Sequence, residues 1–72
     1  SDGMTLDSKG NVYLTGKGVT IYDQQGTKVQ HIAIPKDWTA NVTFGGKDRK
    51  TLFITAQQAV YLLEMNVQGA KP

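Results

Sequence analysis

Short apolar runs, separated by polar turns that contain glycine, occupy almost the whole chain. Runs of this length with turn residues on both sides are typical of β-strands. Apolar positions do not keep a helical period for more than about a turn anywhere in the sequence. The pattern therefore predicts strands at residues 4–7, 11–15, 19–22, 28–34, 41–44, 51–56 and 59–65.

The segments between these strands have the composition of tight hairpin turns. Residues 7–10, 23–26 and 45–48 each place a glycine where a turn needs a positive φ. Residues 15–18 (Thr-Gly-Lys-Gly) lack the spacing of a phosphate-binding loop and precede a strand, which favours another hairpin turn. We expect the strands to follow one another as an antiparallel meander.

The strand pattern occurs twice along the chain. The sequence Met-Thr-Leu at residues 4–6, followed after a turn by Val-Tyr-Leu-Thr at 12–15, returns as Val-Thr-Phe at 42–44 and Leu-Phe-Ile-Thr at 52–55. The two copies are offset by 38 residues at the first strand and by 40 at the second. A period near forty filled with short strands is typical of propeller blades. The prediction is an all-β fold, an antiparallel meander that forms about two blades of a β-propeller.

The repeat also predicts how the chain is divided. Residues 1–34 would form blade one, 35–40 a linker, 41–66 an incomplete blade two that lacks its outermost strand, and 67–72 a tail. Pro35 ends the outer strand of the first blade because it cannot donate to a strand ladder. Trp38 lies in the crossing, where a large aromatic side chain is expected to wedge between blades and not to stack on a ligand.

Continuous apolar runs at residues 52–54 and 60–63 predict strands that are covered on both faces. Two blades cover only the faces that they share, so the two outer faces would expose more apolar surface than monomers usually tolerate. We therefore expect a partner, either the remainder of a propeller or other copies of this chain.

Charge and composition exclude several classes of function. The 8 lysines and arginines against 6 acidic residues give a net charge of +2, and the basic residues are scattered, which argues against nucleic-acid binding. The chain lacks cysteine and has one histidine, His31, so neither a disulfide framework nor an imidazole-rich metal cluster is expected. No apolar run is long enough for a membrane helix. We expect a soluble protein, and both the cytoplasm and the periplasm remain open.

Four features in order resemble the gluconolactonase-like six-bladed propellers, the family of senescence marker protein, or regucalcin. They are Asp-Gly-Met at residues 2–4 before an inner strand, the hairpin at 7–11, Phe-Gly-Gly-Lys at 44–47 and Thr-Leu-Phe-Ile-Thr at 51–55. The resemblance covers nearly the whole chain and corresponds to the C-terminal third of such an enzyme.

The resemblance implies a sugar-lactone hydrolase with a divalent metal, calcium, zinc or manganese, held on the propeller axis by oxygen ligands from several blades. It implies one site residue here, Asp2, as a metal ligand and as the catalytic carboxylate that activates water. The family's other ligands, an acid from an early blade and an asparagine from a middle blade, lie upstream of this sequence. Asn11 and Asn41 do not replace them, because Asn11 opens a strand after a turn and Asn41 corresponds to Gly3.

Calcium needs about six to eight oxygen ligands and magnesium about six, so one carboxylate holds neither tightly. The isolated chain is expected to be inactive and to bind metal only in a completed propeller. Two functions stay open: part of a metal-dependent lactone hydrolase, or a non-catalytic blade module that self-assembles into a closed ring. A partner that supplies the missing ligands would favour the enzyme, and a symmetric homo-oligomer would favour the module.

Overall fold

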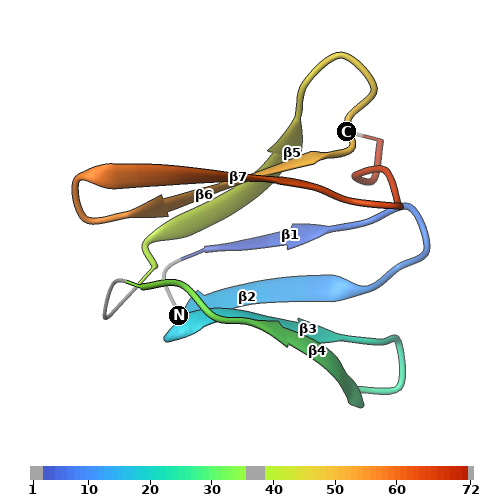
Figure 1. Cartoon of the computed structure of the whole chain (residues 1–72). Coiled ribbons are helices and arrows are strands. Elements are labelled where there is room, and N and C mark those ends of the chain that lie inside the picture. The colour runs from blue at the N-terminus through green and yellow to red at the C-terminus, as the bar shows by residue number, and fades with distance from the viewer. Residues whose placement is uncertain (1–2, 36–38, 72) are drawn as a thin grey trace.

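The structure is a computed structural model that describes residues 3–35 and 39–71. These residues form two antiparallel sheets, which confirms the all-β prediction (Figure 1). The four-stranded sheet contains β1 (Met4–Leu6), β2 (Val12–Gly16), β3 (Gly18–Tyr22) and β4 (Lys28–Ile32). The three-stranded sheet contains β5 (Asn41–Gly45), β6 (Thr51–Ala56) and β7 (Ala59–Glu64). Within each sheet every strand pairs with the next one along the chain, as a meander requires.

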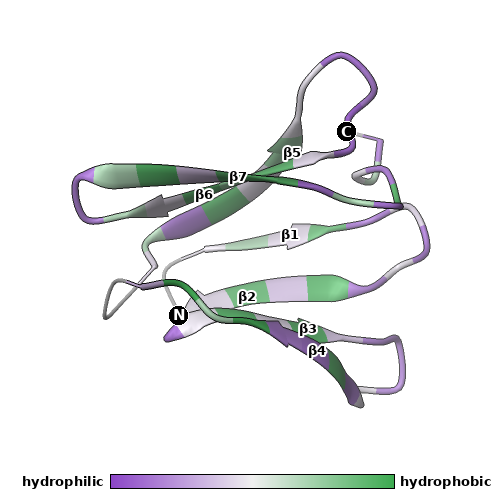
Figure 2. Ribbon diagram, in the orientation of Figure 1, coloured by the Kyte–Doolittle hydropathy of each residue, from purple (hydrophilic) through white to green (hydrophobic). Residues whose placement is uncertain are grey.

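The turns have the backbone conformations that their glycines favour. Gly10, Gly26 and Gly46 each have φ of 84°, a region that residues with a Cβ rarely adopt. Arg49 and Gln57 also have positive φ, at 56°, and the sequence offered no glycine there to predict it. Polar residues gather in these turns, as Figure 2 shows. No helix in the described ranges is long and apolar enough to cross a membrane.

The hydrophobic core lies between the two sheets. The four-stranded sheet contributes Tyr13, Val19 and Ile21, and the three-stranded sheet contributes Val42, Leu52 and Ile54. All six are at most 3% exposed. The ring of Tyr13 meets that of Phe44 edge to face across the sheets, with centroids 5.2 Å apart and planes at 82°. Each sheet therefore covers one face of the other.

The chain crosses from one sheet to the other next to Thr39, which is only 2% exposed. Its hydroxyl donates to the carbonyl of Gly18 at 2.7 Å and accepts from the backbone N–H of Gly16 at 3.1 Å. The next residue, Ala40, donates its N–H to the Thr55 carbonyl at 2.8 Å. The crossing is thus tied to both sheets. Trp38, which was predicted to wedge between blades, lies outside the described residues.

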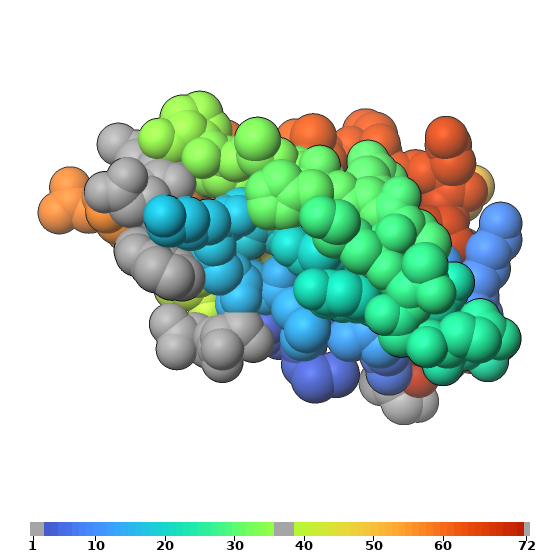
Figure 3. All heavy atoms as spheres, turned by 90° about the horizontal axis from the view of Figure 1, so that it is seen from below, coloured from blue at the N-terminus to red at the C-terminus, as the bar shows by residue number. Residues whose placement is uncertain are grey.

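Strand β4 is the exposed outer strand of its sheet, with four of its five residues exposed. In the space-filling view from below, β4 (green) runs along the surface beside β3 (teal) (Figure 3). The pairing of β3 with β4 shifts register between Ile21 and Tyr22. Val29 lies within the resulting irregularity and is 54% exposed.

Residues 68–70, which were expected to belong to a tail, are instead bound between the sheets. Gly69 forms an isolated antiparallel bridge with Asp7 and donates its N–H to the Arg49 carbonyl at 2.8 Å. The Ala70 N–H donates to the Leu6 carbonyl at 2.9 Å. Gly69 is buried, so this segment connects the end of β1 to the turn between β5 and β6.

Candidate functional site at the start of strand β1

The residue predicted to carry the chemistry, Asp2, lies outside the described residues. Its chain neighbour Gly3 is described and leads directly into β1. Strand β1 lies beside β5, the first strand of the other sheet. The surroundings of Gly3 therefore define the framework next to the candidate ligand.

Thr15 on β2 holds the Gly3 residue on both sides. The Gly3 N–H donates to the Thr15 hydroxyl at 2.9 Å, and that hydroxyl donates to the Gly3 carbonyl at 3.1 Å. The backbone N–H of Thr15 also donates to the Gly3 carbonyl at 3.1 Å. Because Thr15 is only 3% exposed, water does not compete freely for these bonds. The peptide groups that follow Asp2 are fixed to the middle of the sheet.

Asn41, the first residue of β5, lies directly against Gly3. A Cβ atom at position 3 would overlap Oδ1 of Asn41 and approach its Cα to 3.0 Å. The same Oδ1 accepts a hydrogen bond from the backbone N–H of Val42 at 2.9 Å. The close approach of the two strands thus requires glycine at position 3. In the sequence repeat Asn41 is the counterpart of Gly3, and this correspondence is the signal that the two strand starts could meet.

The described residues do not form a metal site on their own. Within residues 3–35 and 39–71, no group of three or more histidine, cysteine, aspartate or glutamate side chains could hold a metal ion. The carboxylate of Asp2 has the oxygen donors that hard divalent cations prefer, but the ligands to complete a site are not among its described neighbours. A cation at Asp2 would need groups from outside this part of the chain.

The buried carboxylate of the described chain belongs to Asp7 and has a structural role. It accepts hydrogen bonds from the backbone N–H groups of Lys9 and Asn11 at 2.9 and 3.0 Å. It also accepts from the side-chain amide of Asn11 and from the hydroxyl of Tyr13, both at 2.9 Å. Asp7 is 2% exposed, and the side chain of Asn11 is engaged here and not at the candidate site.

These hydrogen bonds and the burial of both groups shift the pKa values of Asp7 and Tyr13. Burial alone would raise the pKa of Asp7, but the hydrogen bonds from Asn11, Tyr13 and Lys9 outweigh it and lower the pKa below the ordinary value of 3.8. Burial, the bond to Asp7 and the negative charge of Asp7 raise the pKa of Tyr13. Asp7 stays ionised and fully bonded at neutral pH, which suits the closing of a turn and not proton transfer.

Two antiparallel meanders that pack face to face, with their first strands side by side, are adjacent blades of a β-propeller. The family model described as the SMP-30/gluconolactonase/LRE-like region matches residues 1–58. The chain belongs to this family, as its motifs had indicated.

Individual relatives agree with the family match. The chain is 37% identical to pentonolactonase XacC of Haloferax volcanii over 57 residues, which cover 75% of this chain and 20% of that protein. It is 29% identical to regucalcin of Gallus gallus over 59 residues, covering 76% of this chain and 20% of regucalcin. An X-ray structure assigned to the gluconolactonases superposes with a TM-score of 0.90 at 29% identity, covering 99% of this chain and 24% of that one. The chain thus spans about a fifth of the length of these curated relatives.

Proposed function

We propose that these residues are part of a metal-dependent sugar-lactone hydrolase, in which Asp2 supplies one oxygen ligand of a divalent cation. Two observations together support the proposal. The relatives include lactonases, and the residue after Asp2 is held by contacts with Thr15 and Asn41. Pentonolactonase is named for the hydrolysis of a sugar lactone, and the family model that matches this chain covers residues 1–58, which include Asp2. Thr15 and Asn41 hold Gly3, the residue after Asp2, between two strands.

In this proposal the described residues position the backbone next to Asp2 and do not react with the substrate. The hydrogen bonds of Thr15 fix the backbone after Asp2, and the contact with Asn41 fixes the distance between β1 and β5. A site held on strands in this way keeps its geometry better than one on a free loop. A bound divalent cation supplies Lewis acidity, which polarises a lactone carbonyl toward attack by water.

The proposal can be tested in a complete propeller. A chimera would carry residues 1–72 in place of the corresponding segment of the solved gluconolactonase, which aligns with 99% of this chain. Hydrolysis of gluconolactone, followed by pH-stat, is expected in the chimera. The Asp2→Asn variant should lose at least about a hundredfold in kcat, because it keeps the shape of the side chain but removes its charge.

Asp48→Asn is the matched control, because Asp48 is an exposed acid in the turn between β5 and β6. It should leave the activity within about twofold of the unchanged chimera. A folded chimera without activity would contradict the lactonase proposal. Equal activity in the Asp2→Asn variant would contradict the role of Asp2.

A further inference from the structure

The side chain of Asn41 lies between the starts of two neighbouring strands. Asn41 is the first residue of β5, and Gly3 comes directly before β1. A Cβ atom at Gly3 would overlap Oδ1 of Asn41 and would lie 3.1 Å from its Cγ, the carbon that carries the amide nitrogen. The amide of Asn41 is therefore beside the backbone that joins Gly3 to Asp2. This contact lies within the chain and does not depend on neighbouring blades.

One hydrogen bond determines which way the Asn41 amide is turned. Its Oδ1 accepts from the backbone N–H of Val42 at 2.9 Å, and Val42 is only 2% exposed. The opposite orientation would place the NH2 group against another donor, so only the oxygen can face Val42. The two N–H groups of Nδ2 are consequently directed away from the Val42 N–H. Asn41 is exposed, and Nδ2 forms no hydrogen bond to any residue of the ranges 3–35 and 39–71.

The two strand starts lie at one end of the propeller channel. Blades surround a central channel, and the first strand of each blade is the one that lines it. Strands β1 and β5 are the first strands of their sheets and lie side by side (Figure 1). Gly3 and Asn41 stand where these strands begin, so both are at the end of the channel to which the proposed function assigns the cation. The N–H donors of Asn41 therefore belong to the channel wall at that end.

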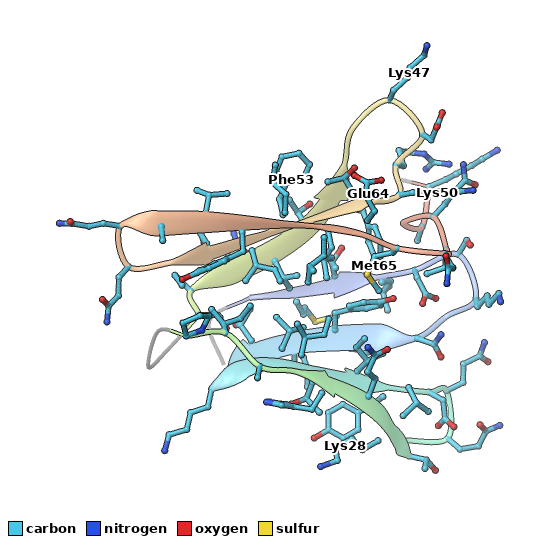
Figure 4. The ribbon with its side chains drawn as sticks, viewed as in Figure 1. Lys28, Lys47, Lys50, Phe53, Glu64 and Met65 are labelled. Atoms are coloured by element: carbon cyan, nitrogen blue, oxygen red, sulfur yellow. The ribbon has the colours of Figure 1, made fainter. Side chains whose placement is uncertain are left out.

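Other described polar groups do not take this role. The Thr15 hydroxyl is 3% exposed and is already bonded to the N–H and the carbonyl of Gly3. Lys47 and Lys50 lie in and after the turn that follows β5, away from the start of that strand (Figure 4). An amide whose orientation is fixed in advance binds an oxygen acceptor with little further loss of entropy. A sugar lactone offers such acceptors, because each hydroxyl oxygen has two lone pairs.

We propose that Asn41 is a substrate-binding residue of the lactonase site, and that its Nδ2 donates a hydrogen bond to a hydroxyl oxygen of the sugar lactone. The inference rests on the proposed function and adds to it a preference for hydroxylated lactones over lactones without hydroxyl groups. Its role differs from that of Asp2, because an amide N–H binds oxygen acceptors and does not ligate a cation.

Substrate selectivity of the chimera tests this role. The value of kcat/KM is measured by pH-stat for gluconolactone and for δ-valerolactone, which has a lactone ring of the same size without hydroxyl groups. Asn41→Ala should lower the ratio of the two values about three- to tenfold, because the lost hydrogen bond affects only the hydroxylated substrate. The ratio does not depend on the folded fraction or on cation occupancy, since the same molecules hydrolyse both lactones.

Gln58→Ala is the matched control for the loss of a side-chain amide. Gln58 is exposed in the turn between β6 and β7, close after Thr55, the pairing partner of Asn41. This variant should keep the ratio within about twofold of the unchanged chimera. A ratio that Asn41→Ala leaves unchanged would overturn the inference, even if both kcat/KM values fall, because Asn41 would then only hold the strand starts together.

A binding measurement tests the same contact without hydrolysis. Anhydroglucitol has the ring and the hydroxyl groups of gluconolactone but no carbonyl, so it cannot be hydrolysed. In an NMR titration of the folded chimera, it should shift the side-chain NH2 signals of Asn41. Asn41→Ala should bind it at least about threefold more weakly, and Gln58→Ala should bind it like the unchanged chimera.

The two measurements separate this inference from the proposed function. A folded chimera that binds anhydroglucitol through Asn41 but does not hydrolyse gluconolactone would support the role of Asn41 and contradict the lactonase proposal. Hydrolysis with an unchanged substrate ratio in Asn41→Ala would have the opposite meaning. Equal affinity of the unchanged chimera and Asn41→Ala for anhydroglucitol, or no binding by either, would overturn the inference.

Discussion

Asp7 shows how one buried carboxylate can organise several residues around it. Its two oxygens bind the turn at Lys9 and Asn11 and the core residue Tyr13, whose ring packs on Phe44 of the other sheet. The Asp7 carboxylate therefore supports the turn after β1, the position of Tyr13 on β2 and, through Tyr13, the contact between the two sheets. Its lowered pKa is the thermodynamic sign that the folded state favours the charged form.

The first prediction concerns the stability that Asp7 contributes. Because the folded pKa lies below the ordinary value of 3.8, this contribution is present above that value and is lost as pH falls through the folded pKa. Asp7→Asn should lower the free energy of unfolding by about 1–3 kcal/mol at neutral pH. Urea denaturation at neutral pH and below pH 3.8 should show that the difference shrinks in acid.

Asp23→Asn provides the matched control for this substitution. Asp23 accepts hydrogen bonds from the N–H groups of Gln25 and Thr27, both at 2.9 Å, and an asparagine oxygen can replace it there. Its effect should stay below about 1 kcal/mol. A loss for Asp7→Asn that was as small, or that did not change with pH, would show that the charge is not what stabilises the turn.

The second prediction concerns Thr15 and the backbone next to Asp2. Thr15→Val keeps the shape but removes both side-chain bonds to Gly3, so it should cost about 1–3 kcal/mol and speed hydrogen exchange of the Gly3 amide. Thr15→Ser keeps the hydroxyl and should retain slow exchange. The two exchange rates can be measured by NMR, and equal rates would mean that the hydroxyl does not hold Gly3.

The sequence predicts these single residues unevenly. It places Gly10, Gly26 and Gly46 correctly because a tight turn needs a positive φ, which is a local property. It does not predict the contact of Gly3 with Asn41, because those residues are brought together by two sheets and not by one turn. Position 2 itself lies outside the described residues, so the role of Asp2 stays a prediction.

At the scale of elements, the segment at residues 68–70 does more than its sequence indicates. It has no alternation of apolar and polar residues that would mark a strand, yet Gly69 and Ala70 form backbone bonds to two different parts of the fold. A Cβ at Gly69 would overlap the side chain of Phe44 at its Cβ and Cγ atoms. The segment can lie there because position 69 has no side chain.

The third prediction follows from this close approach. Gly69→Ala should displace the segment, since the Cβ of Phe44 cannot move without its strand. Hydrogen exchange at the Ser8, Gly69 and Ala70 amides should become at least about tenfold faster. Gly26→Ala is the control, because a Cβ there meets nothing within 4 Å, and it should not speed exchange at those amides selectively. Unchanged exchange in Gly69→Ala would show that the contact with Phe44 does not limit docking.

The strands themselves were predictable to within one or two residues of their ends. The bounds of β6 were predicted in full, because its apolar run is continuous and the turn before it contains glycine. The strand predicted at 28–34 ends earlier, at Ile32, where the chain leaves the sheet toward the crossing. Local pattern thus determines the strands, whereas the contacts of Thr39 and Gly69 depend on how the sheets are placed.

At the scale of the whole molecule, the four-stranded and three-stranded sheets form a partial propeller of about two blades. The chain aligns with 24% of the X-ray structure assigned to the gluconolactonases, and it carries one predicted ligand of a site that needs about six oxygens. The fourth prediction is that the purified 72-residue chain does not hydrolyse gluconolactone above the rate of the buffer. Activity measured by pH-stat in a chain free of other proteins would contradict this prediction.

The proposed lactonase function depends most on Asp2 acting as a cation ligand in a complete propeller. The most direct measurement is calorimetric titration of calcium, zinc and manganese into the folded chimera and its Asp2→Asn variant. We predict that at least one of these cations binds the chimera and that Asp2→Asn weakens its binding at least about tenfold, because an amide replaces a charged ligand. Equal affinity of the two proteins for every cation would show that Asp2 is not a cation ligand.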